Sequence, residues 1–306
     1  MQEKSPLFIS GGSGLLAVNW AFTMSQQYEV YLGLHNRIIK PAGIHVVDAS
    51  LESLDDLLKQ LKAINPGAII HTAGLTNVEI CEENPELAQH VNVELSSNIA
   101  TASKILGIPL VHISTDHLYQ GTQANTDELE SLHPLNIYGE TKAKAEGAVL
   151  KNNENALVIR TNFYAWGPSY RQSFSDRIID ALRRKREIVL FKDVYYNPIL
   201  AEALILTVHE LLEKKAKGIF NIVSDDRISK FDFGITIAKE FGLDTKYIKP
   251  GSIRSNSALV NRPADMSLSN NKVRSLLGRK IGTVADQIKR LHDQELEGIV
   301  KEIQML

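Results

Sequence analysis

Tyr138 and Lys142 lie four residues apart and form the pair with the clearest capacity for chemistry in this chain. Residues at i and i+4 of a helix share one face, so a helix over this segment places the phenol beside the ammonium. A phenol of pKa about 10 exchanges protons poorly at neutral pH unless a nearby cation stabilises the phenolate, and Lys142 can supply that charge. Thr115 follows the apolar run 110–113, where its hydroxyl can share a substrate carbonyl oxygen with Tyr138. The three residues predict a site that acts on a carbonyl group.

The segment 7–16 places glycines between two apolar runs. It predicts a strand, a tight turn and a helix whose first amides and dipole favour an anion such as a pyrophosphate. Gly12, Gly14 and Ala17 fit the dinucleotide-binding pattern G-x-G-x-x-A, and Gly11, Gly14 and Ala17 fit a G-x-x-G-x-x-A variant. Such a turn also occurs for structural reasons alone. The Thr, Tyr and Lys residues downstream decide in favour of a dinucleotide site.

Short apolar runs alternate with amphipathic segments through the first half of the chain. Strands are predicted at 7–10, 30–33, 44–47, 68–71, 110–113 and 156–159, and helices at 15–24, 51–63, 85–106 and 138–150. This alternation predicts right-handed βαβ crossovers and a doubly wound parallel sheet, a Rossmann-like α/β fold with ligands at the carboxyl ends of its strands.

The pattern changes after about residue 162. A loop-rich stretch at 164–173 precedes predicted helices at 175–186, 201–215, 230–241 and from 284, and predicted strands at 188–191, 218–222 and near 247–249. We therefore predict a dinucleotide-binding domain at 1–162 and a smaller, mainly substrate-binding α/β lobe at 163–306, with room for interleaved segments. The loop 251–269, which carries Arg262, is expected to lie over the cleft.

Composition excludes several classes of protein. The 306 residues include 34 Lys and Arg and 36 Asp and Glu, a net charge of −2, which offers no basic field for nucleic acid or a membrane surface. No apolar segment approaches the ~18 residues of a membrane span. Residues 1–6 lack the apolar core of a signal peptide. Cys81 is the only cysteine, so no internal disulfide is expected, and we predict a cytoplasmic protein.

Taken together, the motifs resemble those of the extended short-chain dehydrogenase/reductase superfamily and, within it, of the dTDP-4-dehydrorhamnose reductase-like family. The resemblance extends over nearly the whole chain. It rests on Gly-Gly-Ser-Gly-Leu-Leu-Ala at 11–17, His-Thr-Ala-Gly at 71–74, Val-Asn-Val at 91–93, Val-His-Ile-Ser-Thr-Asp at 111–116, Pro-Leu-Asn-Ile-Tyr-Gly-Glu-Thr-Lys at 134–142, Ile-Arg-Thr-Asn-Phe at 159–163 and Arg-Pro-Ala-Asp-Met-Ser-Leu at 262–268.

The resemblance implies an NAD(P)-dependent oxidoreductase with Thr115, Tyr138 and Lys142 as catalytic triad. In the family, the tyrosine protonates a keto oxygen while NAD(P)H delivers hydride to the carbon. The lysine lowers the tyrosine pKa and binds the nicotinamide ribose. The cofactor-binding positions implied in this way, besides Tyr138 and Lys142, are Gly11, Ser13, Gly14, Leu15, Leu16, Ala73, Gly74, Asn92 and, at the adenine end, Asp48.

The substrate-binding positions implied are Thr76, Thr115, Phe163, Asn197 and Arg262. Phe163 stands in a segment where dehydrorhamnose reductases commonly carry a tryptophan that contacts the sugar, which leaves the identity of the sugar open. Asn19 stands where some members carry a glutamate tied to metal-linked dimerisation. No metal is therefore predicted, and whether the chain forms a homodimer stays open.

The end of the second predicted strand bears on the choice of cofactor. A carboxylate there would bind the ribose 2′-hydroxyl and select NAD. The sequence Leu-Gly-Leu-His-Asn-Arg at 32–37 contains none. Arg37, with His35 near it, can neutralise a 2′-phosphate and favours NADP(H) over NAD(H). The alternative is that Arg37 is a solvated loop residue.

The resemblance, together with Arg37, implies NADPH-dependent reduction of a nucleotide-activated 4-keto-6-deoxy sugar. An epimerase or dehydratase on the same fold is one alternative, although the Asp-Glu pair usual in dehydratases is replaced here by Asp116-His117. The other alternative is a non-catalytic NADP-binding protein that resembles the regulatory subunit of methionine adenosyltransferase. The intact Thr, Tyr and Lys set favours the enzyme.

Overall fold

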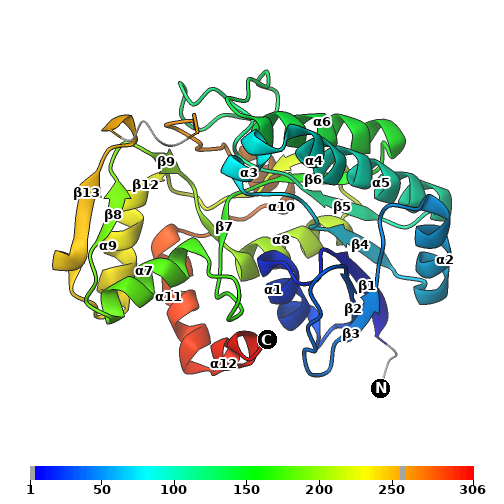
Figure 1. The fold of residues 1–306 in the computed structure, drawn as a ribbon, viewed down its shortest axis with the longest axis horizontal. Coiled ribbons are helices and arrows are strands. Elements are labelled where there is room, and N and C mark those ends of the chain that lie inside the picture. The colour runs from blue at the N-terminus through cyan, green and yellow to red at the C-terminus, as the bar shows by residue number, and fades with distance from the viewer. Residues whose placement is uncertain (1–3, 256–259) are drawn as a thin grey trace.

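A seven-stranded parallel sheet forms the centre of the protein (Figure 1), seen here in a computed structural model that describes residues 4–255 and 260–306. Within the predicted loop 251–269, residues 256–259 lie outside the described residues. The sheet confirms the predicted doubly wound α/β fold. In spatial order its strands are β11 (Gly218–Asn221), β6 (Leu157–Arg160), β5 (Leu110–Ile113), β4 (Ala68–His71), β1 (Ser5–Ser10), β2 (Tyr28–Leu34) and β3 (His45–Asp48).

The direction in which the chain adds strands reverses at β1. This strand pairs with β2 on one side and with β4 on the other, so the loops that follow β1 and β4 lead away from each other. In an open parallel sheet, that divergence leaves a crevice at the carboxyl ends of the strands, where ligands bind. The glycine turn after β1 and the segment Ala73-Gly74 after β4 both lie at this crevice.

Helices cover both faces of the sheet. Along β1, Leu7 and Ile9 enter one apolar cluster and Phe8 enters the other, because successive side chains of a strand point to opposite faces. The first cluster includes α1 (Leu15–Met24) and α8 (Ala201–Glu213), which pack against each other. The second includes residues of α2 (Leu54–Ile64), α5 (Leu95–Leu106) and α6 (Ile137–Asn152).

The second lobe combines a helical layer with small sheets, and Figure 1 shows it beside the carboxyl ends of the large sheet. Its helices are α7 (Phe174–Arg183), α9 (Lys230–Glu240), α11 (Val284–Leu296) and α12 (Ile299–Gln304). Its strands pair as β10 (Ile199–Leu200) with β7 (Phe163–Tyr164), β12 (Ile228–Ser229) with β9 (Tyr195–Tyr196), and β13 (Ile248–Gly251) with β8 (Ile188–Phe191). Short helical turns lie at Thr245–Tyr247 and Ile253–Ser255.

The structure differs from the sequence-based prediction in several elements, among them the short strands β7, β9, β10 and β12, which were not predicted. The helix predicted at 85–106 is divided into α4 (Pro85–Gln89), a π-helical turn (His90–Glu94) and α5. Three short helices were not predicted: α3 (Val78–Glu83), α10 (Asn271–Leu277) and α12. β11 pairs with β6 and α8 packs on α1, so the second half of the chain completes the large sheet with interleaved segments, for which the predicted domain division left room.

Among residues 4–255 and 260–306, no helix has both the length and the apolar character needed to cross a membrane.

Candidate active site

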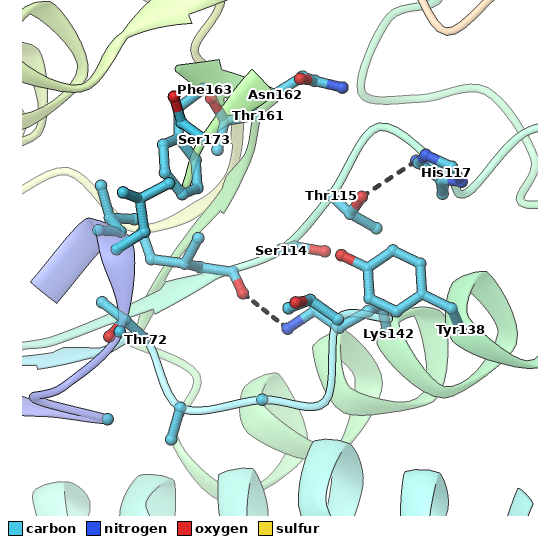
Figure 2. A pocket seen from close by; sticks show the side chains of 18 of the residues that line it. Thr72, Ser114, Thr115, His117, Tyr138, Lys142, Thr161, Asn162, Phe163 and Ser173 are labelled. Carbon is cyan, nitrogen blue, oxygen red and sulfur yellow. Dashed lines mark hydrogen bonds between the residues drawn. The ribbon is translucent and has the colours of Figure 1, made fainter. Parts of the chain in front are cut away.

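A cavity of about 530 Å³ opens at the carboxyl ends of β1, β4, β5 and β6, at the crevice of the sheet. Its lining comes from segments far apart in the sequence (Figure 2). They are the glycine turn and the start of α1, the loop after β4, the loop after β5, the start of α6, the loop after β6, and the loop that leads into α7.

The glycine turn has the geometry of an anion site. Gly11 has a φ of +69°, and a Cβ at this residue would come within 2.7 Å of the Ala73 backbone, so only glycine fits. Gly14 is the N-terminal cap of α1 and no side chain caps the helix. The first amides of α1 are therefore left for another acceptor, and the helix dipole favours an anion there. Ser13, Leu15 and Leu16 line the same wall.

Thr115, Tyr138 and Lys142 meet in this cavity (Figure 2). The Asn136 side chain accepts a hydrogen bond from the Gly139 amide and starts α6, which carries Tyr138 and Lys142 inward. Both side chains are buried, at 9% and 4% exposed. Gly139 allows α6 to approach the loop after β5, because a Cβ there would lie 2.3 Å from the His117 carbonyl oxygen.

Burial dominates the electrostatics of this pair. It raises the pKa of Tyr138 above its ordinary value, against the opposing effect of a hydrogen bond from Thr115. The phenol therefore stays protonated at neutral pH, which is the form that donates. Burial also lowers the pKa of Lys142 to about 8, and the attraction of Glu146 opposes the shift. The Lys142 Nζ donates to the Ile113 carbonyl oxygen at 2.7 Å.

Four polar residues of the cavity and its edge were not predicted as ligand contacts. Asp116 accepts a 2.6 Å hydrogen bond from Asn162, and burial raises the pKa of its carboxyl to about 6. The His117 ring lies edge-on to the Tyr138 ring, with centroids 5.5 Å apart, and burial lowers its pKa to about 3. Lys230 begins α9, faces Asp116 and has its pKa lowered to about 8 by burial. No sequence motif pointed to Lys230, because β9, β12 and α9 bring it to the site from a segment distant in sequence from the other site residues.

A loop of the second lobe spans the crevice. The Tyr170 hydroxyl donates to the Ser13 carbonyl oxygen at 2.8 Å, and Arg171 donates to the Thr76 hydroxyl at 3.2 Å. The Arg37 guanidinium lies 4.2 Å from the centroid of the Tyr170 ring. Arg37 is thus beside the glycine turn although it does not itself line the cavity.

The remaining predicted residues divide into two groups. Ala73, Gly74, Thr76 and Phe163 line the cavity, as do Gly11, Ser13, Gly14, Leu15 and Leu16. The residues that do not line it are His35, Arg37, Asp48, Asn92, Asn197 and Arg262. His35 and Asp48 are exposed, at the ends of β2 and β3.

Three of the residues outside the lining already have partners. The Asn92 amide bonds to both backbone polar atoms of Leu75 and to the Thr141 hydroxyl, so it fixes the loop that lines the cavity. Asn197 bonds to the backbone of Asp226 and Leu268. Arg262 pairs with Glu79 of α3. These contacts occupy Asn197 and one nitrogen of Arg262, and the substrate role of both residues stays a prediction.

Residues 5–296 match the family described as RmlD substrate binding domain. The chain belongs to this family. The match confirms the predicted resemblance and the short-chain dehydrogenase/reductase type of oxidoreductase. It covers both the large sheet and the second lobe.

Relatives of this family member include a probable reductase and a subunit of methionine adenosyltransferase 2. The probable low-salt glycan biosynthesis reductase Agl14 of Haloferax volcanii is 26% identical over 289 residues, which are 93% of this chain and 96% of that protein. Methionine adenosyltransferase 2 subunit beta of Rattus norvegicus is 25% identical over 280 residues, which are 88% of this chain and 82% of that protein.

Solved structures share the fold. dTDP-4-dehydrorhamnose reductase from Bacillus anthracis, in complex with NADP, superposes with a TM-score of 0.84 at 23% identity and covers 95% of this chain and 99% of its own. WbmG from Bordetella bronchiseptica, in complex with NAD and UDP, superposes with a TM-score of 0.80 at 17% identity and covers 99% of both chains.

Proposed function

We propose that this protein reduces a nucleotide-activated 4-keto-6-deoxy sugar with NADPH. The observation that carries the proposal is the convergence of Thr115, Tyr138 and Lys142 on the cavity that also holds the glycine turn. The turn suits a dinucleotide, because Gly11 admits close backbone approach and the N-terminus of α1 has no side-chain cap.

Three side chains have separate roles in the proposed carbonyl reduction. NADPH, when bound, supplies the hydride that adds to the carbonyl carbon. The Tyr138 hydroxyl donates its proton to the carbonyl oxygen, and the Thr115 hydroxyl donates a hydrogen bond to the same oxygen. The Lys142 ammonium then stabilises the phenolate left on Tyr138. Hydride and proton together convert the ketone to an alcohol, and Tyr138 recovers its proton from solvent.

Cationic and aromatic groups at the second-lobe end of the cavity suit a nucleotide-sugar. The Lys230 ammonium lies 5.7 Å from the centroid of the Phe174 ring, and the Arg177 guanidinium lies 5.8 Å from it. Phe174 lines the cavity. A diphosphate finds positive charge there, and an aromatic ring offers a surface to a base or sugar.

The preference for NADPH rests on Arg37. No carboxylate follows β2 to bind a ribose 2′-hydroxyl, and the Arg37 guanidinium stands over Tyr170 next to the glycine turn. A 2′-phosphate bound there would meet a planar group that can donate two hydrogen bonds.

A regulatory role is the second candidate, favoured by the similarity to methionine adenosyltransferase 2 subunit beta over 88% of this chain. Such a protein binds the dinucleotide but reduces no sugar. The two candidates differ in turnover, not in cofactor affinity.

The deciding experiment measures NADPH consumption with dTDP-4-dehydrorhamnose for the wild type and Tyr138→Phe. General acid catalysis contributes ~10²–10⁴-fold, so the variant should lose that much of kcat and keep its NADPH dissociation constant. A variant with more than about a third of the wild-type rate would show that Tyr138 is not the proton donor. A wild type that binds NADPH but reduces none of a panel of nucleotide-4-keto sugars would favour the regulatory role.

A further inference from the structure

Two buried histidines lie behind the catalytic lysine. His71 ends β4 and His112 is in β5, and both are 0% exposed. Their rings stack with centroids 5.3 Å apart. Burial lowers the pKa of both imidazoles, that of His71 to about 3, so both are neutral at physiological pH.

The two rings differ in their partners. His71 is fully bonded, with Nδ1 2.7 Å from the Ser10 hydroxyl and Nε2 2.9 Å from the Ser96 hydroxyl. His112 places Nε2 3.5 Å from the Lys142 Nζ, and its Nδ1 has no partner among the residues that the structure describes. An ammonium only donates, so Nε2 must be the acceptor and the ring proton must be on Nδ1.

That arrangement destabilises the fold, because a buried donor without an acceptor loses its bonds to water. An apolar side chain at position 112 would avoid this loss; its register partners there are His71 of β4 and Val158 of β6. Stacking on His71 does not satisfy this donor, so packing alone does not account for the imidazole, whereas its contact with Lys142 gives it a role.

We propose that His112 is a positioning residue for Lys142. Its Nε2 and the Ile113 carbonyl oxygen accept two of the three ammonium protons, and the third is directed to the cavity. The inference rests on the proposed function, because it concerns the lysine assigned to the reduction.

The charged and titratable groups around Lys142 determine the direction in which loss of His112 shifts the pKa of the lysine. His112 faces it from β5 and His71 from β4, both neutral, and Tyr138 and Glu146 face it from α6. Glu146 is itself paired with Arg160. Loss of the His112 acceptor removes a hydrogen bond that is stronger to the ammonium than to the neutral amine, so it lowers the pKa of Lys142 below about 8.

The proposal predicts a pH-dependent defect in His112→Leu. The ammonium form is lost as pH rises through the lysine pKa, so the basic limb of kcat against pH moves toward acid. A shift of about one to two units would leave the rate within about twofold of wild type near pH 6 and lower it about 5- to 50-fold near pH 8. His112→Gln, which keeps an acceptor, should restore most of the basic limb.

Thermal unfolding separates positioning from packing. His112→Leu removes an unsatisfied donor but also leaves one proton of the Lys142 ammonium without an acceptor, so it should unfold close to the wild-type temperature. His71→Leu is the matched control: it leaves the Ser10 and Ser96 hydroxyls without their partner, so it should unfold earlier while the basic limb stays in place.

A direct titration keeps this test independent of turnover. In protein labelled with ¹³C at the lysine ε carbons, the Lys142 signal is the one lost in Lys142→Met, and its pH midpoint reports the pKa. The same midpoint in wild type and His112→Leu would overturn the role of His112, whatever the enzyme turns over. A lower midpoint in His112→Leu would support it even if no keto sugar were reduced, and in that case only the proposed function would fail.

Discussion

Arg37→Ala should weaken the binding of NADPH more than the binding of NADH. In the wild type, the Arg37 guanidinium lies 4.2 Å from the Tyr170 ring centroid, and the Tyr170 hydroxyl is bonded to the Ser13 carbonyl oxygen. The substitution therefore has two effects. It removes a donor for the 2′-phosphate of NADPH, and it removes a cation stacked on the loop that spans the crevice.

The two effects have different sizes. A hydrogen bond between charged groups contributes roughly 1.5–3 kcal/mol, or about 10- to 150-fold in affinity. Arg37 is exposed, so the lower half of that range applies, about 10- to 40-fold for NADPH. An exposed cation–π contact contributes about 0.5–1 kcal/mol, so its loss should weaken both cofactors by no more than about fivefold.

Titration of both cofactors by calorimetry separates the two effects. Tyr170→Leu is the control, because it removes the stacked ring and the hydrogen bond to the Ser13 carbonyl oxygen but keeps the guanidinium; it should weaken NADPH and NADH by the same factor. The NADPH loss in Arg37→Ala should also shrink at high salt, since an exposed charge is screened. Equal losses for the two cofactors, or a wild type that prefers NADH, would mean that Arg37 is only a solvated loop residue.

Two further substitutions test other parts of the molecule. The guanidinium of Arg160 and the carboxylate of Glu146 are 2% and 3% exposed and 2.7 Å apart, so Glu146→Gln leaves a buried cation uncompensated and should cost about 3–5 kcal/mol in the free energy of unfolding. Denaturant unfolding measures this, and an unchanged midpoint would contradict it. Lys230→Met should raise KM for a nucleotide sugar about tenfold or more with little change in kcat. Because the pKa of Lys230 is about 8, the wild-type KM should rise as pH increases through that value, whereas the variant KM should not; parallel profiles would exclude Lys230 from the substrate site.

Much of the fold could be predicted because it depends on local patterns. The strands at 68–71, 110–113 and 188–191 and the helix at 15–24 have the predicted bounds. The strands at 68–71 and 110–113 are buried on both faces and read as short apolar runs, and a glycine turn marks where a strand passes into a helix. The pattern of βαβ units then restricts the sheet to a doubly wound arrangement.

The central residues of the site could be predicted from the sequence for the same reason. Tyr138 and Lys142 are one helical turn apart, and Thr115 follows a strand, so local geometry and the rule for parallel sheets bring them to one edge. What local geometry does not specify is which hydrogen-bond partner a polar side chain finds. The sequence did not predict that Asn197 bonds to the backbone of Asp226 and Leu268, or that Arg262 pairs with the carboxylate of Glu79.

The sequence by itself determined the elements, the class of sheet and the Thr115, Tyr138 and Lys142 set. Only the tertiary structure placed β11 at the edge of the large sheet, Lys230 near the cavity and His112 behind Lys142. The first group depends on periodicity and on spacings of a few residues, which the chain carries locally. The second depends on contacts between residues 30 or more positions apart, as between His112 and Lys142. Many partners compete for such contacts, and the packing of the whole molecule selects among them.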